Sequence, residues 1–134
     1  MGSIALSVPT AQPGAAYLPG GQCYVVFSTN AVTVREIIAA KVGAELRKAR
    51  LGGPATSSIG VLLPPGKRYG FSPLQEALCI AQACEGFTAG RFLLVVNDAP
   101  MVALDDVVTL KSTTTRICFL STSFASPTVA AYVV

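Results

Sequence analysis

The segment from Arg91 to Leu120 constrains the fold more than any other part of the chain, because strand-like runs and turn signals follow one another there at short intervals. The apolar run Phe92–Val96 has the composition of a strand, and the turn residues Asn97 and Asp98 follow it directly. The alternating run Thr115–Leu120 predicts a second long strand. We therefore expect the two runs to lie in one sheet.

A helix is predicted to begin near Thr33. Thr33 and Glu36 have the spacing of a capping box, in which each side chain satisfies a backbone N–H group near the other residue. Ile37, Ile38, Val42 and Leu46 then recur at helical spacing and predict the buried face. Gly52, Gly53 and Pro54 end the pattern.

Together these segments resemble the ubiquitin-like family. The resemblance consists of the Val32–Val42 helix start, the Arg-led strand and turn, the polar pair Asp105 and Asp106, and the Lys111 turn before the last strand. The runs Thr33–Ile38 and Arg91–Leu93 are also similar to ubiquitin-like proteins of bacterial operons that encode activating and conjugating enzyme homologues. The resemblance implies an α+β, ubiquitin-like β-grasp fold, in which a mixed sheet packs on a main helix.

The length of 134 residues predicts one domain, larger than ubiquitin by an inserted second helix and a C-terminal extension. Its expected parts are an N-terminal hairpin in 1–31, the main helix in 33–51, the insertion in 54–90, the sheet strands in 91–120 and the extension in 121–134. The hairpin would pair Ile4–Val8 with Tyr24–Ser28.

The inserted helix has its own start signal, with Ser72 as the cap, Pro73 in the first turn and Gln75 at the capping-box position. We expect it to end before Gly86 or Gly90. Its predicted buried stripe consists of Leu74, Leu78, Ala81 and Cys84.

Strand parity assigns the sheet two faces. If Phe92, Leu94 and Val96 point toward the main helix, Leu93 and Val95 point away from it, and Arg116, Cys118 and Leu120 do so on the last strand. By resemblance, Leu93 and Cys118 hold positions of the main recognition patch of ubiquitin. These five outward residues are the candidate interaction surface. The alternative is that the inserted helix covers this face, and the sequence favours neither.

Apolar residues make up 51% of the chain and charged residues 13%, with a mean hydropathy of +0.57, which predicts a homo-oligomer that covers apolar surface. The C-terminal extension lacks glycine and favours strand pairing, either within its own subunit or on a neighbour's sheet edge. The candidate assembly tail contains Thr128, Val129, Tyr132, Val133 and Val134. No apolar run is long enough for a membrane helix, and no signal sequence is recognisable, so we expect a cytoplasmic protein without a membrane partner.

Enzymatic function is not expected, because the chain has no histidine, phosphate-binding loop or nucleophile elbow. The sequence thus predicts no catalytic, cofactor-binding or metal-binding residue. Its four cysteines, Cys23, Cys79, Cys84 and Cys118, form no C-x-x-C pair and are expected to be free thiols. The net charge is +3, and the basic residues Lys41, Arg47, Lys48 and Arg50 are interpreted as a solvated helix face, not as a nucleic-acid surface.

The expected function is that of a non-enzymatic ubiquitin-like protein that assembles with itself or docks a partner, within a bacterial ubiquitin-like pathway. Activating or conjugating enzyme homologues are the partners that the resemblance suggests. One alternative is a protein modifier precursor, although the Gly-Gly terminus of such modifiers is missing here. A structural assembly protein unrelated to conjugation is the other alternative.

Overall fold

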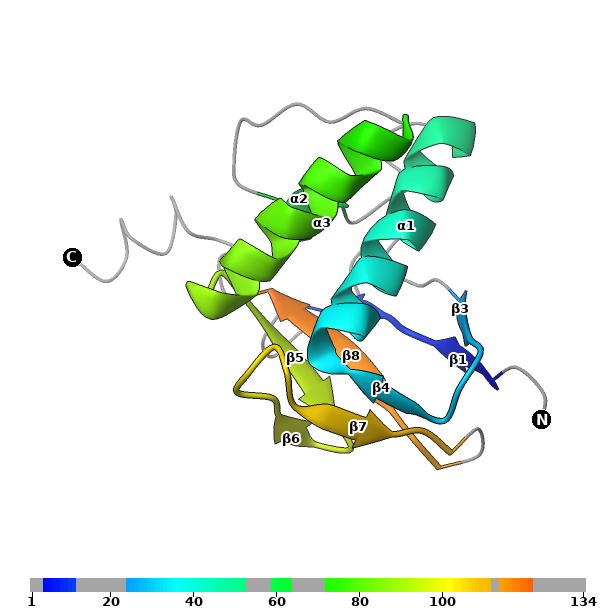
Figure 1. Cartoon of the computed structure of the whole chain (residues 1–134), viewed down its shortest axis with the longest axis vertical. Coiled ribbons are helices and arrows are strands. Elements are labelled where there is room, and N and C mark those ends of the chain that lie inside the picture. The colour runs from blue at the N-terminus through cyan, green and yellow to red at the C-terminus, as the bar shows by residue number, and fades with distance from the viewer. Residues whose placement is uncertain (1–3, 12–23, 53–58, 64–71, 112–113, 122–134) are drawn as a thin grey trace.

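The computed structural model describes residues 4–11, 24–52, 59–63, 72–111 and 114–121 (Figure 1). These residues form an α+β fold with a helix layer on one side of the strands, as the sequence predicted at the level of fold class. The helices are α1 (Val34–Gly52), α2 (Ile59–Leu62) and α3 (Pro73–Thr88). The strands are β1 (Ile4–Ser7), β2 (Thr10–Ala11), β3 (Tyr24–Phe27), β4 (Ala31–Thr33), β5 (Phe92–Val96), β6 (Ala99–Pro100), β7 (Val107–Thr109) and β8 (Ile117–Ser121).

The main helix α1 begins as predicted. The Glu36 backbone N–H donates to Thr33 Oγ1 at 3.1 Å, and the Thr33 N–H donates to Glu36 Oε1 at 2.8 Å. The N–H groups of Val34 and Arg35 donate to the carbonyls of Asp106 and Leu104, both at 2.9 Å. The first turn therefore has its orphan donors satisfied from within the helix cap and from the loop before β7.

The first strand region pairs with two different neighbours. β1 pairs with β3 in an antiparallel ribbon, and β2, which follows β1 after Val8 and Pro9, pairs in parallel with β8. β2 is not predicted by the sequence, because Pro9 indicates the start of a loop. Pro9 has no N–H group to donate, but its carbonyl accepts the Phe119 N–H at 2.9 Å.

The larger sheet has the strand order β2-β8-β5-β6, and β4 pairs separately with β7. β5 and β8 are antiparallel neighbours, so the two runs singled out in the sequence do lie in one sheet. The turn between β5 and β6 consists of Asn97 and Asp98, with φ values of 51° and 69°. Positive φ at both positions is typical of the two-residue turns that join twisted hairpin strands, and Asn and Asp tolerate it.

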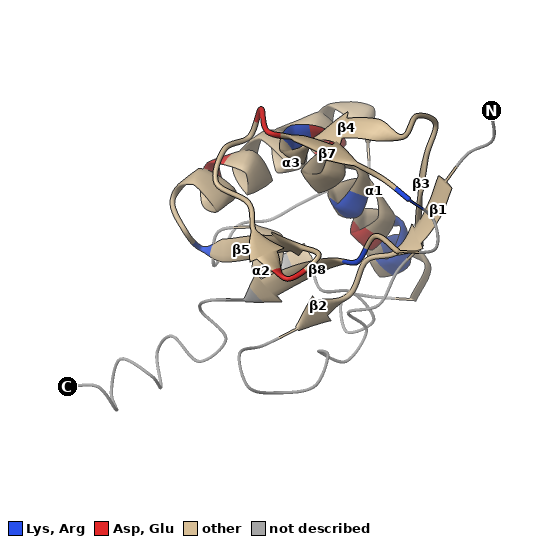
Figure 2. Ribbon diagram, turned by 90° about the horizontal axis from the view of Figure 1, so that it is seen from below, with Lys and Arg blue, Asp and Glu red and all other residues tan. Residues whose placement is uncertain are grey.

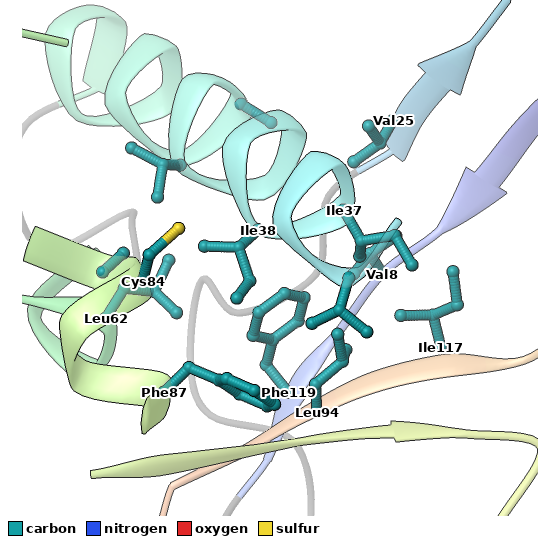
Figure 3. Packing of buried hydrophobic residues seen from close by; sticks show 14 of the residues in the cluster. Val8, Val25, Ile37, Ile38, Leu62, Cys84, Phe87, Leu94, Ile117 and Phe119 are labelled. Carbon is teal, nitrogen blue, oxygen red and sulfur yellow. The ribbon is translucent and has the colours of Figure 1, made fainter. Parts of the chain in front are cut away.

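The core lies between the helices and the inner face of the strands (Figure 3). Ile37 and Ile38 of α1 are buried against it, as predicted, together with Val42 and Leu46. The Phe92 ring stands between those of Phe87 and Phe119, with centroid separations of 6.3 and 5.6 Å. These contacts join α3, β5 and β8 into one hydrophobic cluster.

The inserted helix α3 has the predicted start but the opposite buried face. Ser72 and Gln75 form the capping box, and the helix ends before Gly90, which has a φ of +81°. Of the predicted stripe only Cys84 is buried; Leu74, Leu78 and Ala81 are exposed. The face that packs against the core instead carries Cys79, Ala83, Cys84, Gly86 and Phe87.

Lys41 was expected on a solvated helix face, and this prediction is wrong. Its side chain and that of Glu45 are both 0% exposed, and their charged atoms are 2.6 Å apart. Lys41 Nζ also donates to the Val8 carbonyl at 2.7 Å and lies 5.6 Å from the centre of the Phe119 ring. A lysine can be buried when its charge is paired and its donors are satisfied, and this one meets both conditions.

Candidate interaction face

The outward face of β5 and β8 carries the five residues predicted from strand parity. Burial alternates along β5, where Phe92, Leu94 and Val96 are buried while Leu93 and Val95 are partly exposed. On the last strand region, Cys118 and Leu120 are partly exposed and Arg116 is exposed. The parity assignment is therefore confirmed for both strands.

The strand register brings four of these residues together. Leu93 pairs with Leu120, and Val95 pairs with Cys118, so each pair lies on the same face of the ladder. Arg116 continues the row and forms an exposed ion pair of 2.8 Å with Asp98. Its backbone N–H donates to Asn97 Oδ1 at 2.8 Å, and its carbonyl accepts the Asn97 N–H at 2.8 Å. The turn thus fixes the position of the charged end of the row.

A groove of about 450 Å³ lies beside this row, between β1 and the start of β8. It forms where the first strand region changes partner, because β1 pairs with β3 while β2 pairs with β8. Val95, Arg116 and Cys118 line it, together with Ala5 and Ser7 of β1. The predicted surface is therefore hollowed at one side.

Tyr24 and Val26 extend the apolar surface onto β3, and the sequence analysis did not include them. Their exposed fractions are 72% and 62%, whereas Val25 and Phe27 between and beyond them are buried. The register places Val26 opposite Ala5, which is also exposed. The alternation of β3 was a signal that could have found them, since the same parity argument applies to any strand with one buried face.

All three described helices pack on the inner face. Residues of α1, α2 and α3 belong to the same buried cluster as Phe92, Leu94 and Phe119. The alternative that the inserted helix covers the outward face is therefore wrong for α3. Figure 2 shows β1, β3 and β5 without charged residues, whereas charges are coloured on the helices, at the turns and beside β8.

Two thiols near these surfaces have altered proton affinity. Burial raises the pKa of Cys118 above its ordinary value of 9.0, and the positive charge of Lys41 partly opposes that change. Burial also raises the pKa of Cys84, where Arg35 has the opposing effect. Both groups are therefore thiols at neutral pH and poor nucleophiles there.

The described residues offer no obvious metal site. Cys79, Cys84 and Cys118 are in the thiol form, and Cys23 lies outside the described ranges. Within those ranges, no group of three or more Cys, Asp or Glu side chains is placed to hold a metal ion. The predicted absence of metal stays a prediction.

Other predictions concern parts of the chain that the structure does not describe. Thr128, Val129, Tyr132, Val133 and Val134 of the candidate assembly tail lie outside the described residues. Among the helices that are described, none has both the length and the apolar character needed to cross a bilayer. Comparison of the chain with protein-family models, curated proteins and solved structures finds no significant match.

Proposed function

We propose that this chain is a non-enzymatic, ubiquitin-like protein of β-grasp topology that associates with copies of itself through the outward face of β5 and β8. The observation that carries the proposal is the row of Leu93, Val95, Cys118 and Leu120, which remains partly exposed while the helices pack on the other side. Such a face fits a protein partner better than a small-molecule substrate, because it is broad and apolar and is bordered by the exposed ion pair of Arg116 and Asp98.

The strand connectivity supports the β-grasp part of the proposal. The first strand region joins two sheets, because β1 pairs with β3 while β2 begins the sheet with the order β2-β8-β5-β6. The first and last strand regions are parallel neighbours, and both flanking pairs are antiparallel. The main helix follows the first hairpin directly through β4. This arrangement agrees with a sheet that grips one long helix, which is what the ubiquitin-like resemblance implies.

Energetics also support association through this face. The partly exposed aliphatic side chains and Cys118 gain about 25 cal/mol for each Å² of apolar surface that a second copy covers. The outward face also includes Tyr24 and Val26, each more than half exposed. Tyr24 adds an exposed aromatic side chain, a residue type that is enriched at interface hot spots.

A charge placed on this face tests the proposal. Val95→Glu would bury a carboxylate at the interface, and we expect it to convert an oligomer into a monomer in sedimentation or light-scattering measurements. The matched control is Val107→Glu, since Val107 is 67% exposed on β7 and lies outside the outward face. Circular dichroism of both variants would establish that they are folded.

Two results would contradict self-association through this face. The first is a wild-type chain that is monomeric at high micromolar concentration. The second is an oligomer that Val95→Glu and Val107→Glu leave equally intact, because the contact would then lie on another surface.

A further inference from the structure

The inserted helix α3 borders a second apolar surface, on the opposite side of the sheet from the outward face. A groove of about 570 Å³ runs between α3, the start of α1 and the loop before β7. Ala77, Ile80, Ala81 and Cys84 form its α3 wall, and Leu104 faces them from the loop. The lining is mostly apolar, with Arg35 and Glu85 as its charged members.

Exposed leucines continue this surface along the helix. Leu74 and Leu78 are 71% and 55% exposed, and each lies three residues before an alanine of the groove wall, Ala77 or Ala81. The groove and the two leucines together, which we call the α3 surface, present large aliphatic side chains where a helix of a solvated domain normally carries polar ones. Such a surface is stable in water when another segment covers it.

The last described residue of β8 lies near the C-terminal end of α3. Ser121 pairs with Phe92, which begins β5 just after α3 has ended. Thr88 and Ala89, at that end of α3, line the groove. Residues 122–134 therefore follow from a point beside the groove's end, and Figure 1 shows the head of the β8 arrow close to the start of β5.

The length and the composition of residues 122–134 also suit the groove along α3. Residues 122–127, at about 3.3 Å each when extended, can span about 20 Å, and residues 128–134 about 23 Å more. From Thr88 back to Ala77 the helix rises about 17 Å, at about 1.5 Å per residue. The segment from Ser121 to Val134 has no charged residue, and Val129, Tyr132 and Val133 provide apolar side chains for the groove.

We infer that residues 128–134 dock into the α3 surface of their own chain. A short tether gives the segment an effective concentration in the millimolar range. Even a modest intrinsic dissociation constant of about 100 µM would then keep about nine-tenths of the molecules closed. Because intramolecular docking needs no partner, this placement of the tail replaces its expected role in the contact between copies.

Limited proteolysis with chymotrypsin would test the docking on the full-length chain. Tyr132 is a cleavage site within the segment, and docking should protect it. Ala81→Glu would place a charge in the groove at an exposed helix position, and we expect cleavage after Tyr132 to become about tenfold faster, as a nine-tenths closed population requires. The matched control is Ala31→Glu, the same exchange at an exposed position of β4 that does not line the groove.

A second measurement keeps the test independent of how one variant folds. In the chain truncated after Pro127, amide exchange of α3 residues should be faster than in the full-length chain, and an added peptide of residues 122–134 should slow it again. Equal cleavage rates in the wild type and in Ala81→Glu would overturn the proposal. It would also be overturned if protection disappeared on dilution, because the segment would then occupy the groove of a second copy.

Discussion

Removal of Glu45 should destabilise the fold strongly, because it leaves the Lys41 ammonium without its counterion in the core. The two charged atoms are 2.6 Å apart, and neither side chain is exposed. At an effective dielectric constant of about 20, that separation corresponds to about 6 kcal/mol of attraction. Glu45→Ala removes this attraction but leaves Lys41 desolvated, so the expected cost is about 3–5 kcal/mol.

Two further variants determine whether the stranded charge is the cause. The double variant Lys41→Met, Glu45→Leu removes both charges and keeps the volume. Its free energy of unfolding should be no more than about 1 kcal/mol below that of the wild type. Lys48→Met should cost under about 1 kcal/mol, since Lys48 is 27% exposed and its Nζ lies 3.8 Å from Glu45 Oε1. The three results together show whether the loss of stability comes from an uncompensated buried charge or from any substitution in α1.

Urea unfolding followed by far-ultraviolet circular dichroism would measure these free energies, since the chain has no tryptophan for a fluorescence signal. The expected loss for Glu45→Ala corresponds to a decrease in Tm of roughly 10–20 °C. A cost below about 1 kcal/mol, or a double variant as unstable as Glu45→Ala, would refute the reasoning. Either result would mean that water reaches the pair.

The remaining predictions concern the helix cap, the core and the thiols. Thr33→Ala should cost about 1 kcal/mol in urea unfolding through loss of the cap, and Ile38→Ala about 2–5 kcal/mol through a cavity; equal costs would contradict the cap assignment. The raised pKa values of Cys84 and Cys118 favour the neutral thiol, so their contribution to stability is complete below pH 9 and is lost as pH rises through the folded-state values. Alkylation of both thiols at pH 8 should accordingly be slow in the native state and fast in urea, and fast native alkylation would contradict the raised pKa values.

Local signals in the sequence predicted the elements well. The capping boxes of Thr33 with Glu36 and of Ser72 with Gln75 involve residues three apart, so they depend little on the rest of the fold. The alternation along Phe92–Val96 likewise predicted the two faces of β5, because one buried face fixes the parity of the entire strand. These predictions needed only contacts within an element or with one neighbour.

The buried face of α3 could not be predicted in this way. Apolar residues surround most of that helix, and periodicity alone does not choose between the stripe with Leu74 and the stripe with Ala83. Apart from Phe87, the structure buries the face with smaller residues, and α3 approaches α1 closely near Gly43. There, a carboxylate oxygen of Glu76 lies 3.3 Å from where a Cβ atom of residue 43 would be. Close packing of two helices outweighed the burial of larger side chains, and that outcome depends on the partner helix.

The burial of Lys41 could not be predicted from the sequence for a related reason. Lys41 and Glu45 are four residues apart, a spacing that is common on exposed helix surfaces and therefore carries little information about burial. The partners that make burial possible include the Val8 carbonyl and the Phe119 ring, which are distant in sequence. A pair of this kind is recognisable only once the strands that cover it are placed.

The structure places the exposed apolar residues of the chain differently from the sequence-based prediction. The sequence predicts that the excess apolar surface lies on one outward face and is covered by contact between copies. Among the described residues, exposed apolar side chains lie on the outward face of β5 and β8 and on the exposed side of α3, where Leu74 and Leu78 lie, and others are scattered at Leu51, Val102 and Val107. A sheet covered by helices on one side has two external surfaces that no single flat partner can cover together. The two proposals therefore give each surface its own occupant: an uncharged segment that begins beside α3 for the helix side, and a second copy for the sheet side.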